Sequence, residues 1–165
     1  MTEEEARRRA WFEAYVERCE RGVMRPPAPG VRYRCPCCGY LTLSARAAYD
    51  ICCLCNWEDD GQDDPRANEA WGGANGSYSL AEARRNFANH LIMYDPGRPT
   101  TRIGGPDSAI ELEAKRAMMA AFNAMPTAPD EAALEVLWRT VGEAEATLSS
   151  ETNRKVKQYE SMHEG

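Results

Sequence analysis

The sequence predicts an α+β fold, in which a short β-hairpin core is flanked by several α-helices. Six of the seven cysteines lie between positions 35 and 55, in two Cys-x-x-Cys pairs. Short segments of alternating apolar and polar residues surround these pairs, as in β-strands. Before and after them, apolar residues recur every three or four positions, as on one face of a helix. Together these observations predict a small zinc-ribbon-like β-hairpin core with several flanking α-helices.

Residues 3–21 are expected to form the first helix, within an N-terminal helical segment at residues 1–25. One face of this helix would carry the apolar side chains Trp11, Phe12, Tyr15, Val16 and Cys19. The opposite face carries Glu and Arg four residues apart, a spacing that allows ion pairs along the helix. Because Cys19 falls on the apolar face, we expect a small buried hydrophobe there and not a metal ligand. The proline-rich residues 26–30 predict an extended connector.

The cysteine-rich region, residues 31–95, is expected to be a metal-binding domain. Residues 31–34 and 40–43 predict two strands, joined by the turn Cys-Pro-Cys-Cys-Gly at 35–39. Such a knuckle turn points backbone N–H groups at thiolate sulfurs and stabilises their charge. Proline stiffens the turn, and Gly39 can take a positive φ directly after the second ligand.

A second knuckle is expected at residues 52–55. Residues 49–51 predict a third short strand that leads into it. Asn56 occupies the position that glycine has in the first knuckle, and asparagine tolerates the left-handed conformation better than most residues.

Two sets of ligands fit the six cysteines. The first set keeps the Cys-x-x-Cys spacing in both pairs: Cys35, Cys38, Cys52 and Cys55. The second set uses the Cys-x-Cys spacing: Cys35, Cys37, Cys53 and Cys55. We favour the first set because Cys-x-x-Cys is the usual spacing in a knuckle. Cys37 and Cys53 would then be spare thiols close to the metal.

Four thiolates at this spacing are typical of a tetrahedral structural zinc site, so Zn2+ is the expected cofactor. A rubredoxin-like iron site has similar spacing and is an open alternative. Disulfides are less expected, because residues 1–9 lack the apolar region of a secretory signal peptide. No apolar run is long enough to cross a membrane. These features predict a cytoplasmic protein.

Three separated motifs, in this order, resemble those of the bacterial cysteine-rich CPCC family. They are CPCCGYLTL at 35–43, YDICCLCNWEDDG at 49–61, and the stretch at 72–87 that begins GGANG and ends at Phe87. The resemblance covers about residues 33–95 and implies a small metal-binding domain of bacterial cytoplasmic proteins. The chain departs from the family at Cys53, where the family often has proline, which leaves the second knuckle less rigid.

A run of acidic residues follows the second knuckle directly. Its carboxylates are Glu58, Asp59, Asp60, Asp63 and Asp64. The run lacks the Asp-x-Asp-x-Asp-Gly pattern and the closing Glu of a calcium-binding EF-hand loop. It predicts either a solvated loop or a docking patch for a basic partner. Pairing with the nearby residues Arg32, Arg34 and Arg46 is a further possibility.

The next segments predict turns and then a helix. The Gly-rich residues 71–76 lack the Gly-Lys-Ser/Thr of a phosphate-binding loop and are expected to be tight turns around the knuckles. A capping box at Ser79 and Glu82 predicts a helix that runs to Tyr94. His90 lies beside its apolar stripe and is expected to be structural or at the surface.

The C-terminal region, residues 106–165, is expected to be a helical hairpin packed on the metal-binding domain. A capping box predicts the first helix over residues 108–125. The second helix begins after Pro129, with acidic residues in its first turn. It carries a heptad stripe of Leu134, Leu137, Val141, Ala144 and Leu148. The serines at 149–150 predict an interruption, followed by a polar tail that frays.

No enzymatic activity is expected. The chain has two histidines, no His-Glu-x-x-His motif and no zinc-deaminase signature. A site of four thiolates leaves no open coordination position for a substrate or an attacking water. The formal net charge of −6 argues against a general nucleic-acid binder, which usually has a basic face.

We therefore expect a zinc protein that acts by protein–protein interaction, in its most concrete form a bacterial immunity protein that neutralises a basic toxin. The acidic residues within 58–64 would contact that partner. A nucleic-acid-associated zinc ribbon is one alternative and would use the basic and aromatic residues at 32–34 and 84–85. A thiol or redox sensor that uses Cys37 and Cys53 is another.

Overall fold

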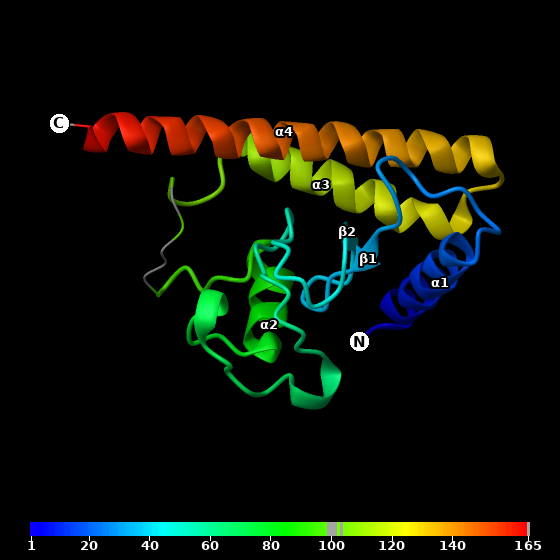
Figure 1. Ribbon diagram of the computed structural model, residues 1–165, viewed down its shortest axis with the longest axis horizontal. Helices are drawn as coiled ribbons and strands as arrows, with labels where there is room; N and C mark the ends of the chain where they lie inside the picture. Colours follow the sequence, from blue (N-terminus) through cyan, green and yellow to red (C-terminus); the bar gives the residue numbers. More distant parts are fainter. Residues whose placement is uncertain (99–101, 103, 165) are drawn as a thin grey trace. The chain divides into compact units, whose positions relative to one another are not determined.

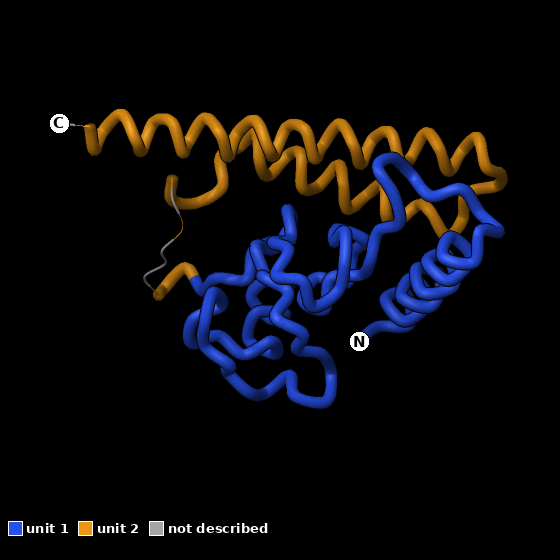
Figure 2. The backbone as a smooth tube through the Cα atoms, viewed as in Figure 1, with its two compact units in different colours: residues 1–95 blue, residues 96–165 orange. Residues whose placement is uncertain are grey.

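The computed structural model describes residues 1–98, 102 and 104–164. The chain forms two compact units, Met1–Asp95 and Pro96–Gly165 (Figure 2). The first unit contains the N-terminal helix, a two-stranded hairpin, the cysteine-rich loops and a second helix, and the second unit contains a pair of helices (Figure 1). The fold is α+β, as the sequence predicts. The N-terminal helix belongs to the same unit as the cysteine-rich region.

Helix α1 spans Glu3–Glu20 and begins with a capping box. The Thr2 hydroxyl accepts a hydrogen bond from the Glu5 backbone N–H, and the Glu5 carboxylate accepts one from the Thr2 N–H. Its apolar face is buried in the first unit through Phe12, Tyr15 and Cys19. Phe12 packs edge-on against Tyr40, which directly follows the first knuckle, with 6.3 Å between ring centroids. This contact ties α1 to the cysteine-rich region.

The hairpin pairs strand β1, Tyr33–Arg34, with strand β2, Leu41–Leu43, in antiparallel orientation. Leu41 and Leu43 are buried, whereas Thr42 between them is half-buried. Because successive side chains of a strand point to opposite faces, Thr42 faces away from the leucine side.

The third strand predicted at residues 49–51 is absent. This segment forms only an isolated bridge between Ile51 and Glu58. Tyr49 has a φ of 62°, which no extended strand residue adopts, so the segment turns before a ladder can form.

Helix α2 spans Leu80–His90 and is capped by the Ser79 hydroxyl, which accepts a hydrogen bond from the Glu82 N–H. It ends before the predicted Tyr94, because Leu91 takes the left-handed conformation with a φ of 60°. The chain then folds back: the N–H of Met93 donates to the carbonyl of Cys55 at 2.8 Å. This bond joins the segment after α2 to the second knuckle.

The second unit is a helical hairpin of α3, Ala109–Ala124, and α4, Glu131–His163 (Figure 1). Ser108 and Glu111 form the expected capping box at the start of α3. The predicted interruption of α4 at residues 149–150 is wrong, since the helix continues through them. None of the helices among the described residues combines the length and the apolar character that a membrane span requires.

Charged side chains, and not apolar ones, close the end of the hairpin where α3 begins. Lys115 is 1% exposed and donates to Asp107 at 2.6 Å. Glu111 is 2% exposed and forms an ion pair with Lys155 of α4. The Lys155 ammonium also donates to the carbonyl of Pro106 at 3.0 Å. These buried bonds explain why α4 stays ordered beyond its apolar heptads, which sequence reasoning missed.

We predict that Glu111→Gln destabilises the hairpin by about 3 kcal/mol, because it leaves the Lys155 ammonium buried without its carboxylate. Urea unfolding followed by far-ultraviolet circular dichroism measures this change. Glu113→Gln, on the exposed side of the same helix, is the matched control and should change stability by less than about 0.5 kcal/mol. Equal effects of the two substitutions would contradict the role assigned to the buried ion pairs.

Acid should weaken the same hairpin. Burial by itself raises the pKa of Asp107, but Lys115 and Arg102 lower it by more, so its net pKa lies below the usual value. Its stabilising contribution is therefore complete above the unfolded pKa of about 4 and is lost as the pH falls through the folded pKa. The free energy of unfolding, measured from neutral to acid pH, should fall more steeply for the parent protein than for Asp107→Asn. Parallel curves would refute this assignment.

Candidate metal centre

The two knuckles, residues 35–39 and 52–56, repeat the same hydrogen-bonded geometry. In each, the N–H of the first cysteine donates to the carbonyl five residues on: Cys35 to Tyr40 at 2.8 Å and Cys52 to Trp57 at 2.9 Å. The carbonyl of the first cysteine accepts from the N–H four residues on, at 2.9 Å in both knuckles. The two turns therefore present their cysteines in the same way.

Each knuckle ends in a residue with left-handed backbone. Gly39 has a φ of 82° and Asn56 a φ of 68°. Glycine adopts this conformation without steric cost, and asparagine is among the residues that tolerate it best. Asn56 thus holds the position expected for it. The residues that follow, Tyr40 and Trp57, are both buried, so each knuckle is anchored by an aromatic side chain.

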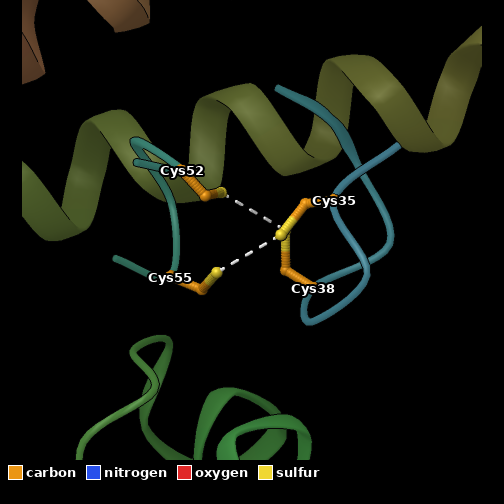
Figure 3. A group of neighbouring side chains, drawn as sticks. All are labelled: Cys35, Cys38, Cys52 and Cys55. Carbon is orange, nitrogen blue, oxygen red and sulfur yellow. Dashed lines mark hydrogen bonds between the residues drawn. The ribbon is translucent and has the colours of Figure 1, made fainter. Parts of the chain in front are cut away.

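Four sulfur atoms converge between the knuckles (Figure 3). The Sγ atoms of Cys35, Cys38, Cys52 and Cys55 all lie within 4.8 Å of one another. Across the two knuckles, the sulfurs of Cys35 and Cys55 are 3.7 Å apart and those of Cys38 and Cys52 are 3.6 Å apart. Thiolates at about 2.3 Å from a tetrahedral zinc ion would lie roughly 3.8 Å from one another. The spacing of the sulfurs therefore fits a metal ion bound by all four.

This group is the set with Cys-x-x-Cys spacing in both pairs. All four side chains are buried. Cys37 and Cys53 lie outside the group; Cys37 is 7% exposed and Cys53 is half-buried. All seven cysteines lie in the described part of the chain, and none is paired in a disulfide.

The four thiols are buried beside one another, so the pKa of each depends on burial and on hydrogen bonds from its neighbours. Burial raises the pKa of Cys38 and Cys55, and hydrogen bonds to neighbouring thiols raise it further. Burial also raises the pKa of Cys52, but hydrogen bonds from the three other cysteines and Thr42 lower it by more, so its net pKa lies well below the usual value. Protons and a metal ion therefore compete for the same sulfurs.

Two hydrogen-bond donors reach the sulfurs of the second knuckle. The Thr42 hydroxyl lies 3.0 Å from the Cys52 sulfur, and the backbone N–H of Trp57 donates to the Cys55 sulfur at 3.4 Å. The second knuckle thus has the N–H-to-sulfur bond expected of such turns. Within the described residues no such bond reaches a sulfur of the first knuckle, which differs from the expectation. Thr42 was missed in the sequence because only the alternation of β2 directs it to the metal side.

The acidic run is largely paired with arginines of its own unit. Asp59 is 0% exposed, and it accepts from Arg46 at 2.9 Å and from the N–H of Ala47 at 2.7 Å. Asp63 accepts from Arg46 at 3.0 Å. Asp64 accepts from Arg84 of α2 at 2.8 Å and from Arg9 of α1 at 3.1 Å. Asp59 is therefore not at the surface, and the run joins α1, α2 and the loop after β2.

Glu58 and Asp60 are half-buried, and neither is ion-paired to an arginine or lysine in the described part of the chain. The side-chain amide of Asn75, in the Gly-rich loop, forms hydrogen bonds with this segment. Asn75 is 4% exposed, accepts from the N–H of Glu58 at 3.0 Å and donates to the Glu58 carbonyl at 2.8 Å. The Gly-rich loop thus wraps the segment after the second knuckle, as expected, but through a buried amide that sequence reasoning did not identify.

The basic residues considered for nucleic-acid contact have internal partners or lie elsewhere on α2. Arg84 donates to the carbonyl of Pro36 at 2.8 Å, inside the first knuckle, as well as to Asp64. The Arg34 side chain is 13% exposed, and burial lowers the pKa of its guanidinium. Arg85 is exposed, and so is His90 at the end of α2.

We predict that the purified chain binds one divalent metal ion, and that Cys52→Ser weakens zinc binding by more than about 100-fold because the site loses one of its four ligands. Competition titration with a chromophoric chelator measures the affinity. Cys53→Ser, at the neighbouring spare thiol, should bind as the parent protein does. The affinity should fall as the pH is lowered, since protons reclaim the thiolates. Equal affinities for the two variants would contradict the ligand set.

The chain matches a known protein family over its cysteine-rich region. Neither the curated proteins nor the solved structures yield a match. The family model described as "Cysteine-rich CPCC" matches residues 33–124. This match begins at β1, includes both knuckles, and extends beyond the range that the three motifs predict, through the end of α3. Because it covers more than half of the 165 residues, the chain belongs to the cysteine-rich CPCC family.

Proposed function

We propose that this protein is a non-enzymatic zinc protein, in which a closed metal centre holds together a surface that binds another protein. The observation that carries the proposal is the convergence of four buried cysteine sulfurs from two knuckles of equal geometry. A metal with all four positions taken by protein ligands stabilises a fold and leaves no place for a substrate.

Zinc is the metal we propose. Support comes from the four-sulfur donor set and from tetrahedral spacing, both usual for structural zinc. Iron in a rubredoxin-like site would have the same ligands. Elemental analysis of the purified chain separates the two metals. One zinc per chain and a colourless protein agree with the proposal, whereas one iron per chain with visible absorption would refute zinc.

The proposed partner is a protein with a basic surface, and neutralisation of a bacterial toxin in the cytoplasm is its most concrete form. Support comes from the net charge of −6 and from Glu58 and Asp60, whose carboxylates have no arginine or lysine partner among the described residues. Two large apolar side chains lie close to them in sequence, Tyr49 at 65% and Ile51 at 63% exposed. Exposed aromatic and aliphatic residues beside charges are typical of protein interfaces.

Substitution of Glu58 and Asp60 tests the proposed contact with a basic partner. The tagged chain, expressed in its own host, should retain a basic protein at one-to-one stoichiometry. The double substitution Glu58→Gln with Asp60→Asn should then weaken that complex by roughly 10-fold, because it removes complementary charges at the contact. The matched control, Glu143→Gln with Glu160→Gln on α4, removes the same charge elsewhere. Equal affinities of the two double variants, or the absence of any stoichiometric protein, would overturn the proposed interface.

A further inference from the structure

We propose that the metal centre is asymmetric: Thr42 shields the second knuckle, and Cys38 of the first knuckle is the ligand through which a soft electrophile opens the site. This inference rests on the four-cysteine zinc site proposed above. It concerns which of the four ligands is lost first when the site is attacked.

The first observation is the position of the Thr42 hydroxyl. On β2, Leu41 and Leu43 are 0% and 1% exposed and fill the core, so the intervening Thr42 projects from the other face. Its oxygen lies 3.0 Å from the Cys52 sulfur. A metal-bound thiolate has no proton to give, so in the metal-bound state the hydroxyl donates and the sulfur accepts. This bond withdraws negative charge from Cys52.

The second observation is the unequal supply of donors to the two knuckles. Cys55 accepts from the Trp57 N–H at 3.4 Å, so both ligands of the second knuckle are hydrogen-bonded. Across the described ranges, no hydroxyl or amide donates to the sulfur of Cys35 or Cys38. The negative charge of four thiolates around one divalent ion is therefore greatest on the first knuckle, and with it the nucleophilicity of the sulfur.

The third observation is the exposure of the four ligand residues to solvent. Cys38 is 7% exposed, whereas Cys35, Cys52 and Cys55 are each 0% exposed. Among the four ligands, Cys38 is therefore the residue with the most contact with solvent. The greater negative charge of the first knuckle and the greater residue exposure thus coincide at Cys38.

An alkylating reagent would react with the Cys38 sulfur by displacement. The Cys38 thiolate attacks the methylene carbon of iodoacetamide, a sulfur–carbon bond forms, the carbon–iodine bond breaks, and iodide leaves with the electron pair. The product is a neutral thioether, which binds zinc poorly. The ion then keeps three thiolates and is released to a chelator.

The test uses the full-length, zinc-loaded chain with limiting iodoacetamide. Peptide mapping follows the label at each cysteine, and a chromophoric chelator follows zinc release. Among the four ligands, Cys38 should be labelled first and at the same rate as zinc is lost. Labels on Cys37 and Cys53 are scored separately, because these residues are outside the ligand group.

Substitution of Thr42 separates shielding from packing. Thr42→Val keeps the branched shape without the hydroxyl, so zinc release should be roughly 3- to 10-fold faster, with label now appearing on Cys52 as well. Thr42→Ser keeps the hydroxyl and should behave as the parent protein does. In the cobalt-loaded chain, the thiolate-to-metal charge-transfer band should move to lower energy in Thr42→Val only.

Two outcomes would overturn the inference alone, while the zinc site itself stands. One is a zinc-loaded chain in which Cys35, Cys52 or Cys55 is labelled before Cys38. The other is an unchanged cobalt spectrum and release rate in Thr42→Val. A chain that holds no zinc at all would instead overturn both the proposed function and this inference.

Discussion

Four cysteine thiols meeting in the protein interior are the constraint on which the first unit depends. Buried sulfurs this close together can carry several negative charges only if a cation lies between them. The sheet of the unit adds few backbone hydrogen bonds, because it consists of a two-residue strand paired with a three-residue strand. Both knuckles also fix their neighbours: Tyr40 packs against α1, and the Cys55 carbonyl sets where the chain turns after α2. A metal ion that holds the knuckles thus holds the helices as well.

Arginine–carboxylate bonds form a second layer around this centre. The acidic run after the second knuckle reaches α1 through Arg9, α2 through Arg84 and the loop after β2 through Arg46. Arg84 also reaches into the first knuckle through the Pro36 carbonyl. Partly buried bonds to several partners hold geometry better than isolated surface pairs do. Most of the acidic run is therefore part of the architecture, and Glu58 and Asp60 are its two carboxylates without an arginine or lysine partner among the described residues.

Local features could be predicted from the sequence, and long-range features could not. Cysteine spacing identified the four sulfurs that converge, and the capping residues placed the starts of α2 and α3. The early end of α2 depends on a bond from Met93 to a residue far away in sequence. The roles of Asn75 and Lys115 depend on burial that no local pattern reveals. Helix α4 is continuous because charged side chains of α3 and α4 form ion pairs. The two serines at 149–150, considered alone, predict a break in the helix.

We expect a bound metal ion to hold the cysteine-rich unit in its folded state. Hydrogen exchange, mapped along the full chain before and after zinc is removed by a chelator, tests it most directly. Amides in residues 31–95 should lose their protection when zinc leaves, while those of α3 and α4 should keep theirs, because the helical hairpin has its own apolar and ionic core. Protection of residues 31–95 that survives complete removal of the metal would show that the unit folds without it.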